Sequence, residues 1–67
     1  MPSYYFAVHA PDDRYDDPEG ADFPDHDAAR KYGQRIVSEL KEGGYDPPGT
    51  ILYVLDETRQ AIQLIPF

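Results

Sequence analysis

One segment of this chain has helical periodicity, and that single helix constrains the fold more than any other feature. Small and apolar residues recur at helical spacing from Ala29 to Leu40, and the remaining positions of the segment are mostly polar. Asp25 stands where it can cap a helix N-terminus, and Gly43 and Gly44 follow where a helix commonly ends. The pattern predicts one amphipathic helix over residues 26–42. A lone helix can cover only one face of a sheet formed by the rest of the chain.

The segments on either side of this helix have the composition of strands. "SYYFAVHA" predicts a strand at residues 3–10, and an acidic loop at 11–19 leads to a short strand at 20–24. After the helix, a linker at 43–49 leads to a hairpin at 50–67, whose turn is "DETRQ". We therefore expect one α+β domain over residues 1–67. Its order is ββαββ, with one antiparallel four-stranded sheet and the helix packed on one face.

Gly33 lies inside the predicted helix, where a glycine costs about 1 kcal/mol relative to alanine. We interpret it as a point of close approach between the helix and the sheet.

Both faces of the predicted sheet carry apolar side chains. Alternation directs Tyr4, Phe6 and Val8 to one face, which we assign to the helix. In the last hairpin we predict that Ile62 and Leu64 face the helix, because the opposite alternation would bury Gln63. The helix-free face then holds the candidate interaction residues, which are Tyr5, His9, Tyr53, Leu55, Ile65 and Phe67.

A second apolar face needs a cover. A domain of 67 residues buries only about 60% of its unfolded surface, and this chain has no cysteine for disulfides. Monomers seldom expose a large contiguous apolar patch. We expect a homodimer, packed sheet on sheet or edge to edge, or a protein partner. The alternative is that these residues are scattered and partly covered by the loop and the termini.

The net negative charge of the chain arises in one segment. Between Pro11 and Asp27 there are eight acidic residues and one arginine, a local net charge of −7 that equals the net charge of the whole chain. A calcium loop aligned on Gly20 would begin at Tyr15 and end at His26, so the EF-hand pattern fails at both ends. We expect a hydrated turn and predict no metal site and no cofactor. A binder that uses this loop to respond to a metal or small ligand is kept as an alternative.

Other functional classes find little support in the residues. The helix carries four basic side chains on its outer face, but two glutamates lie beside them and the acidic segment repels phosphate, so nucleic-acid binding is not expected. No glycine-framed serine and no cysteine nucleophile is present, and His9 and His26 have no partner at telling spacing. We predict a non-enzymatic protein. With no apolar run of bilayer length and no signal-peptide pattern, we expect a cytoplasmic location and no membrane partner.

Three stretches, "MPSYYF", "DPEGADFPDHDAAR" and "LDETRQAIQLIPF", together resemble a family of short uncharacterised bacterial proteins with a domain of unknown function. Members of that family open with Met-Pro-x-Tyr-Phe-Phe and close with Pro-Phe. This sequence departs from the pattern at Arg59, where a turn glycine is common, and at Gly33, where alanine is common. The resemblance implies no established activity.

The order of elements is also similar, at the level of architecture, to antitoxins of the HicB type. That likeness implies an alternative function, a regulatory protein that binds an enzyme partner or DNA. Our main hypothesis from the residues is a small interaction module that associates with itself or with a partner through the helix-free face or a sheet edge.

Overall fold

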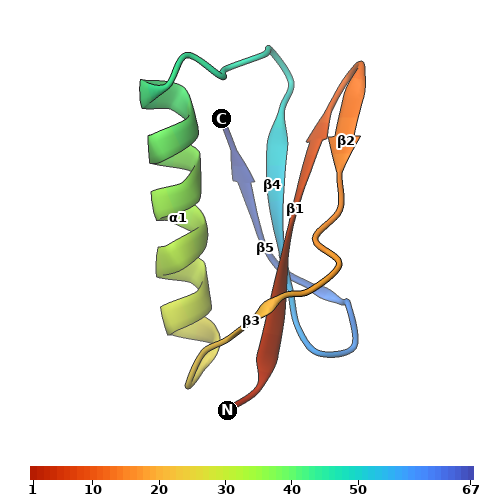
Figure 1. The fold of residues 1–67 in the computed structure, drawn as a ribbon, viewed down its shortest axis with the longest axis vertical. Coiled ribbons are helices and arrows are strands. Elements are labelled where there is room, and N and C mark those ends of the chain that lie inside the picture. The colour runs from red at the N-terminus through yellow and green to blue at the C-terminus, as the bar shows by residue number, and fades with distance from the viewer.

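The computed structural model describes residues 1–67 and contains one helix and an antiparallel sheet of five strands. The elements, shown in Figure 1, are β1 (Ser3–Ala10), β2 (Asp13–Tyr15), β3 (Ala21–Asp22), α1 (His26–Glu42), β4 (Ile51–Leu55) and β5 (Ala61–Pro66). The α+β class is confirmed. The expected count of four strands and the ββαββ order are wrong, because the chain forms an additional strand, β2, between the first strand and the short one.

The segment expected as an acidic loop at 11–19 begins as a tight hairpin. The chain turns at Pro11 and Asp12, and β2 pairs with the end of β1, with Ala10 opposite Asp13 and Val8 opposite Tyr15. β3 covers only two residues of the expected 20–24 and pairs with the start of β1. β2 and β3 therefore lie end to end along one edge of β1. The sheet order is β2-β1-β4-β5, with β3 also bonded to β1.

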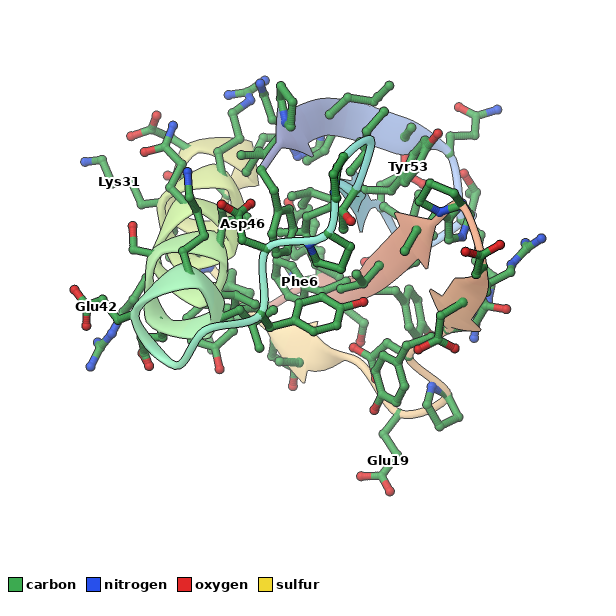
Figure 2. The ribbon with its side chains drawn as sticks, turned by 90° about the horizontal axis from the view of Figure 1, so that it is seen from above. Phe6, Glu19, Lys31, Glu42, Asp46 and Tyr53 are labelled. Carbon is green, nitrogen blue, oxygen red and sulfur yellow. The ribbon has the colours of Figure 1, made fainter.

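The core lies between α1 and the sheet. Its buried members come from three elements: Tyr4, Phe6 and Val8 on β1, Leu52 and Val54 on β4, and Ala29 and Val37 on α1. The first three are the residues that strand alternation directed to the helix. Figure 2 shows Phe6 on the side of the sheet that faces α1 and Tyr53 away from it, whereas Lys31 and Glu42 project from the outer side of the helix.

Local sequence signals define both ends of α1. The Asp25 carboxylate accepts a hydrogen bond of 2.9 Å from the Ala28 N–H, and Asp27 places a negative charge in the first turn. At the other end the Gly43 N–H donates to the Glu39 carbonyl at 3.0 Å. This helix is neither long enough nor apolar enough to cross a membrane.

At Gly33 α1 packs closely against the sheet. An added Cβ there would lie 2.8 Å from Cγ2 of Val54 and 3.2 Å from Cδ1 of Ile65. The structure thus explains the glycine by close packing.

The orientation of β5 differs from our expectation. Leu52 lies opposite Ile65 and Val54 lies opposite Gln63, and cross-strand partners share a face, so Ile65 and Gln63 face α1. A register shift between Val54 and Leu55 leaves Ile62 packed against the core as well. Gln63 is tolerated on this side because β5 is an edge strand, where the helix-facing position is only half-buried.

The turn between β4 and β5 is organised by one carboxylate. Asp56 accepts hydrogen bonds from the Thr58 N–H at 2.9 Å, the Thr58 hydroxyl at 2.7 Å and the Gln60 N–H at 3.0 Å. Arg59 adopts a left-handed backbone with φ 65°, a conformation that glycine adopts without strain. In the family that this sequence resembles, the residue at this position is commonly glycine.

Candidate functional site

The helix covers only part of its own side of the sheet. α1 packs on β4 and β5, the last two strands in the sheet order. Strands are spaced by about 4.8 Å and a helix is about 10 Å across, so one helix covers roughly two strands. β2 therefore has no helix above it, whereas side chains of α1 still reach β1, with Tyr32 packed on Phe6 and His26 beside Tyr4.

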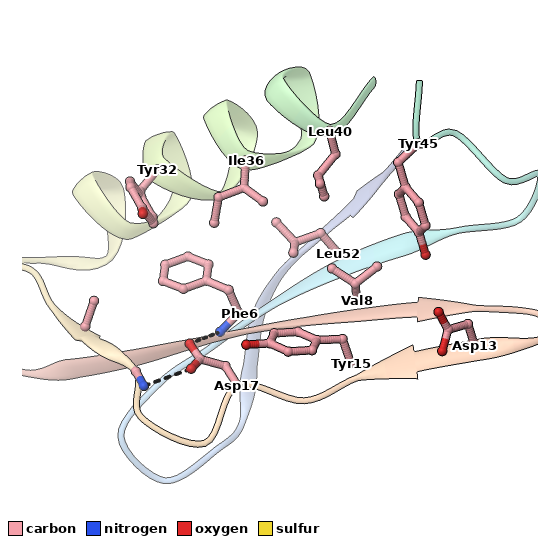
Figure 3. A pocket seen from close by; sticks show the side chains of 12 residues that line it. Phe6, Val8, Asp13, Tyr15, Asp17, Tyr32, Ile36, Leu40, Tyr45 and Leu52 are labelled. Carbon is pink, nitrogen blue, oxygen red and sulfur yellow. Dashed lines mark hydrogen bonds between the residues drawn. The ribbon is translucent and has the colours of Figure 1, made fainter. Parts of the chain in front are cut away.

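Beside the helix lies the largest hollow of the molecule, a groove of about 500 Å³ between α1 and the β1–β2 edge (Figure 3). Its floor is formed by Phe6 and Val8 of β1 and by Leu52 of β4. Residues of α1 line one wall, and the chain from β2 to β3 lines the other. The complete lining is Phe6, Val8, Asp13, Tyr15, Asp17, Gly20, Ala21, Tyr32, Ile36, Leu40, Tyr45 and Leu52.

Two tyrosines on opposite walls are unusually exposed for their size. Tyr15 on β2 is 61% exposed and Tyr32 on α1 is 42% exposed. The Tyr32 ring packs on Phe6 and Phe23, with ring centroids 5.2 and 5.1 Å away, and so closes one end of the groove with an aromatic cluster. Large amphipathic rings at the rim of an apolar hollow are typical of binding surfaces.

Asp17 builds the second wall. One of its carboxylate oxygens accepts from the Phe6 N–H at 3.3 Å, and the other accepts from the N–H groups of Glu19 at 3.2 Å and Gly20 at 3.0 Å. The Phe6 N–H lies at the edge of β1 in the gap between β2 and β3. The carboxylate thus takes the place of a strand there and holds the loop against the groove.

Negative charge surrounds the same wall. Asp13 and Asp17 line the groove, and Asp12 and Glu19 are exposed in the adjoining turn and loop. The salt bridges of the molecule involve none of these four acids. Asp16 differs, because hydrogen bonds from His9 and Arg14 lower the pKa of its carboxyl group. The groove therefore combines an apolar floor with one wall of uncompensated carboxylates.

A second, smaller hollow of about 220 Å³ lies near the start of α1 and is lined by Pro2, Tyr4, His26, Asp56, Glu57 and Thr58. The Tyr4 hydroxyl lies 2.7 Å from Nδ1 of His26. Burial raises the pKa of Tyr4, and the nearby Asp25, Glu57 and Asp56 carboxylates raise it further. The phenol therefore keeps its proton, and its hydrogen bond with the imidazole ties β1 to the first turn of the helix.

The six candidate interaction residues do not share one face. Ile65 and Phe67 pack against the core on the helix side, and the Phe67 ring lies 5.9 Å from that of Tyr45. Their expected place on the helix-free face is wrong, because the phase of β5 is opposite to the one that we inferred. Leu64 is found there instead, opposite Tyr53 and 48% exposed.

The other four, Tyr5, His9, Tyr53 and Leu55, do lie together on the helix-free face, along β1 and β4. The chain itself covers part of this surface. The Arg59 guanidinium lies over the Tyr5 ring, 4.0 Å from its centroid, and the His9 and Tyr53 rings are 4.6 Å apart. Ala7, which lies between Tyr5 and His9 on β1, is only 3% exposed.

The free edge of β5 is poorly suited to strand addition. The Phe67 N–H points inward, toward the Thr50 carbonyl at 3.0 Å. Backbone N–H groups alternate in direction along a strand, so the backbone nitrogen of Pro66 points outward, to the free edge. Proline has no N–H to donate, which interrupts the edge.

No three of the His, Asp and Glu side chains gather into a group that could hold a metal ion. The acidic residues of the hairpin instead bond to backbone N–H groups or to Arg14 and His9.

A scan against known protein families matches residues 3–67 to a domain of unknown function, DUF6894. The chain belongs to this family. The resemblance to a family of short uncharacterised proteins is therefore confirmed, whereas no comparison shows a likeness to HicB-type antitoxins. The search of curated proteins and the search of solved structures returned no match.

The groove is the feature that sequence reasoning missed. We treated residues 11–19 as a solvated loop, so Tyr15 had no assigned face. The signal was present in "HAPDDRY", because two residues of turn type lie between segments that can pair. Pairing Val8 with Tyr15 would have placed this tyrosine on the helix side of the sheet.

Proposed function

We propose that this member of the DUF6894 family is a non-enzymatic interaction module whose groove beside α1 binds a segment of a partner protein. The observation that carries the proposal is the apolar groove of about 500 Å³ with Tyr15 and Tyr32 exposed on its opposite walls. Tyrosines that become buried in a protein interface contribute strongly to the binding free energy.

The chemistry of the lining supports binding over catalysis. The groove holds no serine, histidine or lysine, and its two carboxylates belong to Asp13 and Asp17. The Asp17 carboxylate already accepts three backbone hydrogen bonds, which leaves it poorly placed to move protons. Both histidines lie outside the groove lining.

Site-specific photo-cross-linking in cells tests this proposal. A benzophenone amino acid is placed at Tyr15, in the groove, and at Leu64, on the helix-free face, as the matched control. Both positions are exposed, so neither replacement should prevent folding. We expect the Tyr15 position to form a discrete adduct whose attached peptide mass spectrometry identifies, and the Leu64 position not to form it. Equal labelling from both positions, or no adduct from Tyr15, would contradict the proposal.

A second candidate function is self-association through the helix-free face. The observation that favours it is Leu64, which is 48% exposed and lies opposite the half-buried Tyr53. Without Ile65 and Phe67 this patch is smaller than we expected from the sequence. A homodimer formed there would leave the groove free, because the two surfaces lie on opposite sides of the sheet.

A further inference from the structure

We propose that the occupant of the groove is an amphipathic α-helix with basic residues along one flank, supplied by a different protein. This inference rests on the proposed function and names the chemistry of its partner.

The width of the vacant strip matches one helix. α1 packs on β4 and β5 and its Tyr32 ring also lies on Phe6 of β1, so the strip that remains is formed by β2 and the end of β1 that pairs with it. Where β2 pairs with Val8–Ala10 of β1, two strands at about 4.8 Å spacing present a surface about 10 Å wide, which is the width of a helix. A second helix lying beside α1 would complete the layer over the sheet.

The walls indicate the length of that helix. Tyr32, Ile36 and Leu40 follow each other at four-residue intervals along α1, and Tyr45 extends the line beyond its end (Figure 3). Eight residues of helix rise about 12 Å, so with Tyr45 included the groove accommodates roughly three turns. A ligand helix needs apolar residues at i, i+3 or i+4, and i+7 to meet this surface.

A second copy of this chain does not supply such a helix. α1 is the only helix, and its apolar stripe is already buried against the sheet through Ala29, Gly33 and Val37. Its outer face carries exposed charged side chains, which include the ion pairs Asp27–Lys31 and Arg35–Glu39. Inserting that face into the groove would bury charge against Phe6 and Val8, which is unfavourable.

The charges on the two walls of the groove indicate which residues the flank of the ligand helix should carry. The β2 wall carries Asp13 and Asp17, and Asp12 and Glu19 adjoin it without a salt bridge. The helix wall contributes only Tyr32, Ile36 and Leu40 to the lining, none of which is charged. A ligand helix therefore meets negative charge on one side only. Lys or Arg along that side would be attracted, and Asp or Glu there would be repelled.

Binding of three synthetic peptides to the intact protein tests the inference by fluorescence anisotropy. The first is an amphipathic peptide of about 14 residues, with leucine on one face and lysine on the flank. The second replaces every lysine by glutamate, and the third scrambles the first. We expect the lysine peptide to bind at least about tenfold more tightly than either control at low salt. The preference over the glutamate peptide should shrink as salt screens the charges.

Matched variants locate the binding. Y15A should weaken binding of the lysine peptide about tenfold, and D13N should weaken it severalfold while not weakening binding of the glutamate peptide. L64A, on the opposite face, should change neither. Tyr15, Asp13 and Leu64 are all exposed, so the three variants should fold, which circular dichroism checks.

Equal binding of the lysine and glutamate peptides, or of the scrambled peptide, would overturn the inference. So would an effect of L64A as large as that of Y15A. These failures are distinguishable from failure of the proposed function. If the Tyr15 cross-link captures an acidic or extended segment, the groove is a binding site and only the helix proposal is wrong. If Tyr15 captures nothing, the proposed function is wrong as well.

Discussion

A few single residues of this protein determine how its strands and its helix pack. The Asp17 carboxylate accepts backbone hydrogen bonds where β1 has no neighbouring strand, and the absence of a side chain at Gly33 lets α1 reach the sheet. Tyr15 and Tyr32 supply most of the aromatic surface that the groove leaves open. In so small a domain each of these contributions is a large part of a marginal stability.

Asp17→Ala should destabilise the protein by about 2 kcal/mol, because three N–H groups lose their common acceptor. Urea unfolding measures the loss. Asp17→Asn should be milder, since its amide oxygen can still accept. The matched control is Asp12→Ala, an exposed acid in the neighbouring turn, which should stay within about 0.5 kcal/mol of wild type. Equal stability of the two alanine variants would show that the loop does not depend on this carboxylate.

Gly33→Ala should also destabilise, by about 1 kcal/mol, although alanine favours helices. The added Cβ would lie 2.8 Å from Cγ2 of Val54, which is fully buried and cannot move aside. Overpacking costs about 1–3 kcal/mol, whereas helix propensity returns at most about 1 kcal/mol. Thermal unfolding measures the difference. Ser38→Ala, at an exposed position of the same helix, should be neutral or stabilising. A Gly33→Ala variant that melts above wild type would disprove close packing as the reason for the glycine.

At the scale of elements, the two hairpins differ in how their turns are held. The β1–β2 turn is two residues long and is followed by the loop that Asp17 anchors. The β4–β5 turn depends on Asp56, and on the left-handed Arg59 whose side chain reaches back over Tyr5. Asp56 also lines the hollow that holds the Tyr4–His26 hydrogen bond, so this turn and the start of α1 are adjacent.

The Asp56 turn should make stability depend on pH. The Thr58 hydroxyl and the Gln60 N–H lower the pKa of the Asp56 carboxyl group in the folded state. A lowered pKa adds stability that is fully present above the ordinary value near 3.9 and is lost as the pH falls through the lower folded value. Asp56→Asn should therefore be less stable than wild type at pH 7, and the gap should close below about pH 4.

Urea midpoints of both proteins between pH 7 and pH 2 provide the measurement. Glu57→Gln, an exposed neighbour in the same turn, is the control and should follow the wild-type curve. A gap between Asp56→Asn and wild type that widens on acidification would contradict the assigned role.

At the scale of the whole molecule, the sheet presents two surfaces with different prospects. The side that carries α1 has a groove with an apolar floor and an acidic wall. The opposite side has a patch around Leu64 and Tyr53 that Arg59 and His9 partly cover. A chain with one helix cannot cover a sheet of this width alone, and the two proposals assign a different occupant to each surface.

Sedimentation equilibrium tests the second surface. If the helix-free face mediates a homodimer, the average mass should rise with concentration, and Leu64→Glu should abolish the rise by placing a charge in the interface. Tyr15→Glu, in the groove, should leave association unchanged. Phe67→Ala should lower the melting temperature instead, because Phe67 packs against the core. A wild-type protein that stays monomeric at all concentrations would refute self-association.

Much of the secondary structure could be predicted from the sequence because its causes are local. The cap at Asp25, the helical spacing from Ala29 to Leu40 and the two glycines after it give a helix at His26–Glu42, as the structure has it. Alternation along Ser3–Ala10 assigns the buried face of β1 correctly. The resemblance to a family of unknown function also followed from short motifs in order.

The candidate site depended on causes that are not local. A single register shift beside Val54 reverses the face of β5, moves Ile65 and Phe67 to the core and brings Leu64 to the surface. The groove exists because α1 settles over β4 and β5, which Gly33 permits by close packing, and because β2 adds a strip that no helix covers. Periodicity predicts which side of an element is apolar. Only tertiary packing decides which part of that apolar surface remains uncovered.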